Sequence, residues 1–175
     1  MAKTYEAIAS QTLGSTASAV TFSSIPSTYT DLRIVCLVRL GSASGSKIRF
    51  NSDSGTNYSA TTVAGQDPSP TAVTSFRYSS ATSIYNNLTW GDATAANQFT
   101  PYTFDVMSYA NTNVFKTTLW GYGTGGGLQG SRSEVGRIVG LWRSTSAITS
   151  IEISVWNPTA YQIGSTFSLY GVKAA

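Results

Sequence analysis

The chain has 175 residues, of which 41% are hydrophobic and 11% are charged, and its formal net charge is +3. This length fits one domain, residues 1–175, with a core large enough to fold without disulfides. The sequence contains no histidine and one cysteine, whereas serine and threonine supply about 50 residues. Catalytic triads that use histidine are therefore excluded, and neither enzymatic activity nor a metal or cofactor is expected.

The basic residues are spread from Lys3 to Lys173 without a cluster. A nucleic-acid-binding protein concentrates such residues on one face or arm, so nucleic acid is not an expected partner. The first nine residues include Glu6 and lack the apolar stretch of a signal peptide, and no later segment is long and apolar enough to be a membrane helix. We therefore expect synthesis in a cytoplasm and no membrane partner. Cys36 lies in an apolar run and is expected to be a buried, unreactive thiol.

Apolar and polar residues alternate with a period of two along much of the chain, and no segment sustains a helical period over three turns. This pattern predicts an all-β protein. In chain order, the predicted strands are residues 4–13, 19–25, 31–40, 47–51, 72–79, 99–110, 114–122, 134–143, 148–156 and 166–173. Residues 83–91 are ambiguous.

Turn signals between these strands indicate how they connect. Residues 25–27 close the first two strands as a pair, and residues 111–113 join strands 99–110 and 114–122 as the clearest hairpin. Strand 31–40 has apolar side chains on both faces at its centre, so we expect it in the middle of a sheet. About ten strands separated by turns predict an antiparallel two-sheet β-sandwich that is jelly-roll-like.

The glycine-rich segment 121–133 matches the G-x-G-x-x-G pattern of dinucleotide-binding loops, for example from Gly121 to Gly126. Such a loop needs a helix immediately afterwards, because the helix N-terminus holds the pyrophosphate. Here a strand is predicted from Glu134 instead. A flexible hairpin tip is the favoured interpretation, and this segment is expected to be the least ordered.

Two further patterns could carry chemistry. Paired carboxylates could perform glycoside hydrolysis if folding brought two of them to the required separation, although most lie at turns or strand ends. The carboxylates are Glu6, Asp31, Asp53, Asp67, Asp92, Asp105, Glu134 and Glu152. Residues 51–57 alternate oxygen-bearing side chains as a calcium loop does, but they depart from the EF-hand pattern. A tight turn is favoured there, with a weak structural ion as the alternative.

Aromatic residues could form a stacking platform for a sugar, although they fill cores more often. The tryptophans are Trp90, Trp120, Trp142 and Trp156. Trp156 is the best candidate for exposure, because Glu152 and Ser154 share its face of the predicted strand. Tyr161 and Tyr122, the latter at the glycine-rich tip, complete the set of candidate glycan contacts.

Three stretches resemble a family of small virion proteins of tailed bacteriophages that are abundant in phages of aquatic bacteria. They are residues 5–14 continuing through 20–26 and 29–32, residues 140–144, and residues 164–173. The middle of the chain, from about residue 41 to residue 130, carries no matching motif. The resemblance implies a β-sandwich unit on the outer surface of a virion head or tail, and it brings no catalytic residues.

Two functions follow from that resemblance. A capsid decoration protein or head fibre would form a symmetric oligomer, expected to be a trimer, and would bind assembled subunits of the major capsid protein. Its first strand, with Tyr5 and Glu6, would then pair with a neighbouring chain. A tail-fibre module, bound to other tail components, would instead present Tyr122, Trp156 and Tyr161 to a host polysaccharide. Decoration is favoured, because the chain lacks the long repetitive shaft of a complete fibre.

Overall fold

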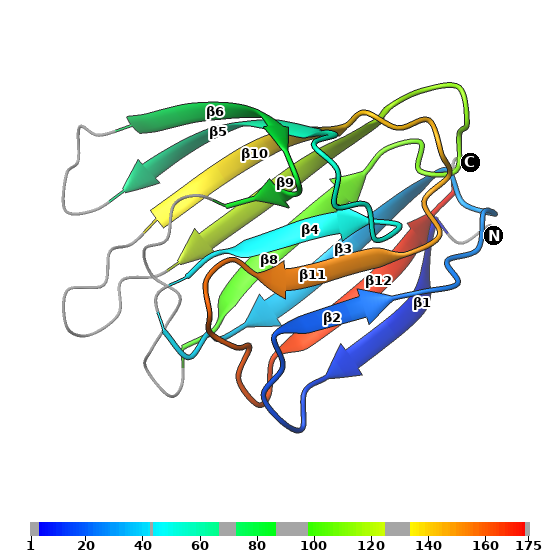
Figure 1. The fold of residues 1–175 in the computed structure, drawn as a ribbon. Helices are drawn as coiled ribbons and strands as arrows, with labels where there is room; N and C mark the ends of the chain where they lie inside the picture. The colour runs from blue at the N-terminus through cyan, green and yellow to red at the C-terminus, as the bar shows by residue number, and fades with distance from the viewer. Residues whose placement is uncertain (1–3, 43, 67–72, 87–97, 125–133, 174–175) are drawn as a thin grey trace.

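The computed structural model describes residues 4–42, 44–66, 73–86, 98–124 and 134–173. These residues form two antiparallel sheets packed against each other and contain no helix (Figure 1). The strands are β1 (Tyr5–Thr12), β2 (Ala19–Phe22), β3 (Asp31–Val38), β4 (Ser46–Phe50), β5 (Tyr58–Gln66), β6 (Val73–Ala81), β7 (Ile84–Tyr85), β8 (Thr100–Val106), β9 (Lys116–Thr124), β10 (Glu134–Trp142), β11 (Ile151–Val155) and β12 (Thr166–Val172). The predicted all-β sandwich is confirmed.

Eight of the strands follow a nested order. In one sheet β1 pairs with β12, and β3 pairs with β12 and β8. In the other sheet β2 pairs with β11, β11 with β4, and β4 with β7. The first of these eight strands therefore lies beside the last, and each later strand lies beside its counterpart counted from the end. This is the strand order of a jelly roll, as the sequence predicts.

Four additional strands widen the larger sheet. The order β1-β12-β3-β8 continues through β9, β10, β5 and β6, which gives a sheet of eight strands against the four of β2-β11-β4-β7. In Figure 1 the small sheet lies in front of β8, β3 and β12, and β10, β5 and β6 extend beyond it. One face of this extension therefore points away from the sandwich.

Strand β3 shows how alternation builds the core. Leu32, Ile34 and Cys36 are buried between the sheets, whereas Val35 and Leu37 point outward and are exposed. Burial raises the pKa of the Cys36 thiol, which agrees with an unreactive side chain. The strand lies between β12 and β8, so its expected place in the middle of a sheet is confirmed.

One expectation about the early strands is wrong, and one strand was not expected. Strands β1 and β2 do not form a pair, because each lies in a different sheet and finds its antiparallel partner near the C-terminus, β12 and β11 respectively. The sequence also gave no expectation of β5. Its inward positions include Ala60 and Thr62 and its outward positions Ser59 and Gly65, which are too small or polar to produce a strong alternation.

The hairpin predicted around residues 111–113 is confirmed, since β8 and β9 pair antiparallel from Tyr102 opposite Tyr122 to Val106 opposite Thr118. The glycine-rich segment 121–133 was expected to be a loop, but its first residues form a strand. Residues 121–124 belong to β9, and residues 125–133 lie outside the described residues. A strand, β10, begins at Glu134 where the dinucleotide-binding pattern would need a helix.

Candidate interaction surface

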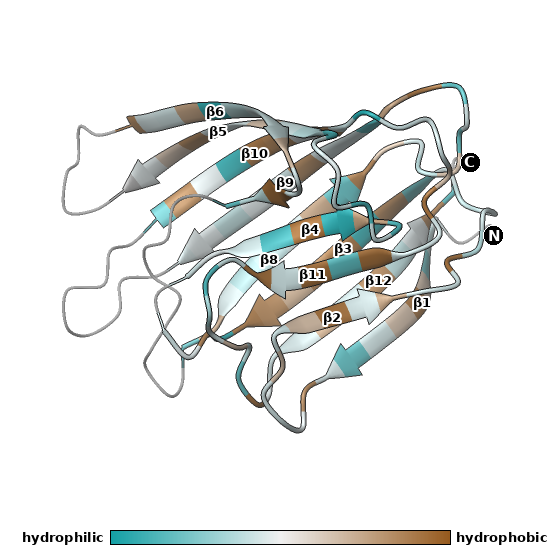
Figure 2. Ribbon diagram, viewed as in Figure 1, coloured by the Kyte–Doolittle hydropathy of each residue, from teal (hydrophilic) through white to brown (hydrophobic). Residues whose placement is uncertain are grey.

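The outward-facing residues of β9, β10, β5 and β6 form a broad surface, which we call the outer face. Alternation along each strand places every second side chain on it. Its members are Thr117, Leu119, Gly121 and Gly123 on β9, Val135, Arg137, Val139 and Leu141 on β10, Ser59, Thr61, Val63 and Gly65 on β5, and Val73, Ser75, Arg77 and Ser79 on β6. Figure 2 shows both hydrophobic and hydrophilic bands on β10.

Aliphatic side chains on the outer face are unusually open to solvent. Val73 is 73% exposed, Val135 67% and Val139 52%. They do not stand singly, because Val139 is opposite Leu119 on β9. Only Gly65 of β5 separates Val135 on β10 from Val73 on β6, and both valines line the same shallow hollow. Exposed aliphatic groups that lie together are typical of interaction sites, so the outer face is a candidate for one.

The charge of the outer face is one-sided. Arg77 and Arg137 are exposed, and neither forms an ion pair within the described part of the chain. The only carboxylate on these four strands is Glu134, which faces inward and is buried. On the neighbouring strand β8, Asp105 lies opposite Leu119, but it is already bound by Arg33, with Nε–Oδ1 and Nη2–Oδ2 distances of 2.5 and 2.9 Å. The outer face therefore carries net positive charge.

The guanidinium of Arg137 lies directly over Gly121, which has no side chain. A Cβ at position 121 would lie 2.5 Å from an Arg137 Nη1 and 3.0 Å from Thr103 Oγ1, so only glycine lets the guanidinium rest on the sheet. Shallow hollows of about 220 Å³ lie on both sides of this arginine, one over Gly123 and one over Gly65. Arg137 thus lies between the two hollows, with its guanidinium over Gly121.

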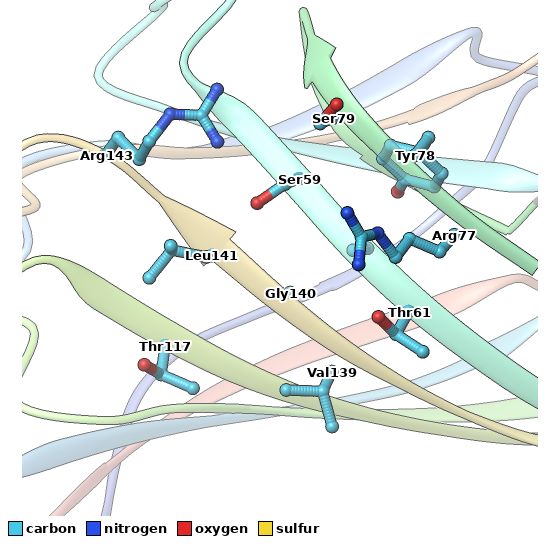
Figure 3. A pocket seen from close by; sticks show the side chains of 11 residues that line it. Ser59, Thr61, Arg77, Tyr78, Ser79, Thr117, Val139, Gly140, Leu141 and Arg143 are labelled. Atoms are coloured by element: carbon cyan, nitrogen blue, oxygen red, sulfur yellow. The ribbon is translucent and has the colours of Figure 1, made fainter.

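A larger groove of about 400 Å³ lies between Arg77 and Arg143. Figure 3 shows both guanidinium groups on the same side of the sheet, with Ser59 between them. Arg143 Nη2 also donates to the Thr56 carbonyl at 2.8 Å, which fixes the position of its guanidinium. The other lining residues carry hydroxyls or aliphatic groups, such as Thr61 and Val139, apart from Tyr78, whose ring is stacked on that of Tyr85. The groove can therefore bind a carboxylate from two sides.

The N-terminal edge contains two of the residues expected to contact a partner. Tyr5 is 49% exposed on β1, the edge strand of the large sheet, and lies under the Arg33 guanidinium at 5.7 Å. Glu6 is held by contacts within the chain, because it accepts a hydrogen bond from Tyr29 Oη and pairs with Lys173 Nζ, both at 3.1 Å. Burial and the Glu6 hydrogen bond raise the pKa of Tyr29.

Trp156 lies at the end of a ladder of stacked rings. Its centroid is 3.9 Å from that of Tyr85, which stacks on Tyr78 at 4.1 Å with an interplanar angle of 4°. Tyr78 Oη accepts a hydrogen bond from the Tyr85 amide at 2.7 Å, and burial raises the Tyr78 pKa. The ladder bridges β6 and β7 at the margin of the sandwich and leaves Trp156 37% exposed. The expectation that Trp156 reaches the surface is confirmed.

Tyr122 and Tyr161 correct the expectation that they contact a glycan. Tyr122 is buried against the backbone of Gly136, where a Cβ would collide with its ring. Tyr161 is fully buried, donates to Ser46 Oγ at 2.9 Å and packs edge-on against Phe167. Both face inward because the tight packing of two sheets needs large rings, so neither presents a side chain to a partner.

The segment 51–57 is a tight turn, as favoured from its sequence. Asn51 and Ser52 have positive φ values of 51° and 57°. Asp53 accepts hydrogen bonds from the Gly55 amide at 2.8 Å, Asn57 Nδ2 at 2.9 Å and Trp142 Nε1 at 2.6 Å. Its carboxylate oxygens are therefore directed at donors in the chain.

The described carboxylates beyond this turn also hold structural positions. Asp31 accepts from the Ser108 amide, and Glu152 pairs with Ser154 Oγ. No group of three or more His, Cys, Asp or Glu side chains that could hold a metal ion occurs in the described ranges. Asp67 and Asp92 lie outside those ranges. The same ranges hold no helix that is long and apolar enough to cross a membrane.

The grouping of arginines on this side of the sheet was not predicted from the sequence. The basic residues are indeed dispersed along the chain, but the pairing of β10 with β5 and of β5 with β6 gathers Arg77, Arg137 and Arg143 on one side of the sheet. The sequence does contain a signal for this grouping. In their predicted strands, Arg77 and Arg137 are an even number of residues from Val73 and Val139, so each arginine shares a face with a valine.

Comparison with family models, with curated proteins and with solved structures finds no match to this chain.

Proposed function

We propose that this chain is a structural protein of a tailed-bacteriophage virion, acting as an outer-surface capsid decoration protein or head fibre. The observation that carries the proposal is the outer face, a broad surface of aliphatic, hydroxyl and arginine side chains with only shallow hollows. Such a surface suits attachment to another macromolecule. Jelly rolls build many viral capsid domains, which supports the proposal, although a fold alone does not fix a function.

The dimensions of the outer face agree with attachment in many copies. The four strands have 9 residues each, so together they span on the order of 600 Å². A standard protein interface buries roughly 800 Å² on each partner, so one such contact is weak. An oligomer that places several outer faces on a repeating lattice gains effective concentration and binds far more tightly than one copy.

A symmetric oligomer, which we propose to be a trimer, would use the free edge of β1. This strand pairs with β12 on one side, and β1 is the last strand of the large sheet among the described residues. Its edge offers backbone groups to a neighbouring chain. Ala7→Lys tests this use of the β1 edge, because a lysine on an edge strand blocks pairing with another chain and leaves β1 in its own sheet. Deleting the first ten residues would be a poorer test, because it would remove most of β1 itself.

The proposal predicts selective binding to assembled heads. Purified protein is expected to co-sediment with heads of the phage that encodes it, after its own copies have been stripped, and to leave dispersed capsid subunits unbound. Selectivity arises because several copies engage the lattice together, so that binding stabilises the assembled state by mass action. Equal binding to dispersed subunits, or no binding to either, would contradict the proposal.

A tail-fibre module that binds a host polysaccharide is the second candidate function, and the aromatic ladder ending at Trp156 favours it. This alternative predicts that Trp156→Ala reduces glycan-array binding about tenfold, in line with the contribution of one aromatic contact. Tyr5→Ala is the matched control, because Tyr5 is an exposed ring elsewhere, on the edge strand β1. An array signal unchanged by Trp156→Ala would remove the ladder as a glycan site.

A further inference from the structure

We propose that the outer face docks onto an acidic protein surface, and that the groove between Arg77 and Arg143 receives one of that partner's aspartate or glutamate side chains. This inference rests on the proposed function and adds the chemistry of the partner. It concerns the outer face together with Arg143, which follows β10 and forms one side of the groove.

Charge complementarity supports an acidic partner. Arg77 and Arg137 carry exposed charges without an ion pair in the described part of the chain, and the one carboxylate on the four strands, Glu134, is buried and faces inward. A planar guanidinium matches a carboxylate with two parallel hydrogen bonds. An acidic surface therefore supplies the carboxylates that the outer face lacks. A second copy of this chain is a poorer match, because its net charge is +3.

The composition of the outer face favours a protein over a polysaccharide. Protein interfaces are enriched in arginine and depleted in lysine, aspartate and glutamate, and their centres are apolar. The outer face follows this pattern, with Val63, Val135 and Val139 around Arg137. Sugar sites commonly offer an aromatic ring for stacking, and none of the sixteen outward positions of the four strands is aromatic. Tyr78 lines the groove, but its ring is already stacked on that of Tyr85 at 4.1 Å.

The groove identifies a point of contact within the face. Its two guanidinium groups stand on either side of Ser59 (Figure 3), and Arg143 is already oriented by the Thr56 carbonyl. Arg77 has no such restraint in the described residues and can turn toward an incoming carboxylate. In many interfaces a few residues contribute most of the binding energy, and arginine is common among them.

Charge reversal tests the docking chemistry directly. We would measure binding of poly-L-glutamate, of polygalacturonate and of neutral dextran to the immobilised protein. Wild type is expected to bind poly-L-glutamate best and dextran not at all, and Arg77→Glu with Arg137→Glu is expected to weaken poly-L-glutamate binding by tenfold or more. Lys47→Glu with Arg49→Glu is the matched control with the same change of charge, because both residues face outward on β4 of the other sheet.

The outcomes separate this inference from the proposed function. Unchanged poly-L-glutamate binding by the double reversal, or stronger binding of polygalacturonate than of poly-L-glutamate, would overturn the inference. If wild-type protein binds assembled heads and the double reversal binds them equally, the outer face is not the docking face while the proposed function stands. If wild type fails to bind heads but shows the expected poly-L-glutamate pattern, the proposed function fails and the docking chemistry remains. Equal thermal unfolding of all variants shows that the effects are local.

Discussion

Replacing Trp142 by alanine is expected to lower the free energy of unfolding by about 3–5 kcal/mol, as for other large buried aromatic side chains. Trp142 is 2% exposed at the end of β10, and its ring lies 5.5 Å from that of Phe50 on β4 and 6.3 Å from that of Tyr58 on β5. It therefore links the small sheet to the extension of the large sheet. Removing it leaves a cavity where the two sheets are joined.

Trp142→Phe isolates the polar part of this contact. Phenylalanine keeps a ring but removes the Nε1 donor that binds Asp53 at 2.6 Å, and a hydrogen bond to a charged group contributes about 2 kcal/mol. Urea unfolding of Trp142→Phe, Asp53→Asn and the double variant would measure their coupling. Additive losses would show that the contact contributes little, and Trp156→Ala serves as a tryptophan control with a smaller expected loss.

The same contact makes stability sensitive to acid. Burial alone would raise the pKa of Asp53, but hydrogen bonds from Trp142, Asn57 and the Gly55 amide outweigh it and lower the pKa. The stabilisation is fully present above the pKa of the unfolded chain, about 3.9, and is lost as the pH falls through the folded-state pKa. The difference in stability between wild type and Asp53→Asn is therefore expected to shrink in that acidic range.

Lys116→Met is expected to cost about 3 kcal/mol of stability at neutral pH. Lys116 is fully buried, and its Nζ donates to the carbonyls of Asn111 at 2.6 Å, Val114 at 2.8 Å and Thr145 at 3.1 Å. Burial lowers the pKa of this ammonium, yet all three of its donors are used. Methionine fills a similar volume but leaves three carbonyls without a donor, which is costly for buried acceptors.

Lys173→Met is the matched control for Lys116→Met. Lys173 forms a half-exposed ion pair with Glu6 at 3.1 Å, and such pairs contribute about 0–1 kcal/mol. Chemical denaturation of both variants measures the difference. A loss at Lys116 no larger than that at Lys173 would mean that the carbonyl cage does not stabilise the fold.

The fold was predictable where alternation is strong and local. Residues 32–38 and the hairpin joining β8 to β9 have clear inward and outward faces, so their strands follow from the sequence. Strand β5 was not predictable, because Ala60, Thr62 and Ala64 bury little apolar surface. The separation of β1 from β2 depends on pairing with β12 and β11 more than a hundred residues later, and no local pattern encodes that choice.

The candidate surface was predictable only in part. Trp156 is exposed as expected, but it lies just beyond β11, and Ser154, expected on the same polar face, is buried. Burial of Tyr122 and Tyr161 depends on contacts between distant strands. The outer face needed the register of β10 against β5, which sets Arg137 opposite Val63. A count of charges along the chain could not reveal it, because pairing of strands creates the grouping.

The position of this protein in a virion tests the account most directly. In a cryo-electron microscopy reconstruction of the virion to which we propose it belongs, the jelly roll is expected to repeat over the head lattice, with the outer face of β9, β10, β5 and β6 against the capsid. Density for the protein confined to the tail tip, or its absence from the particle, would contradict a capsid decoration protein.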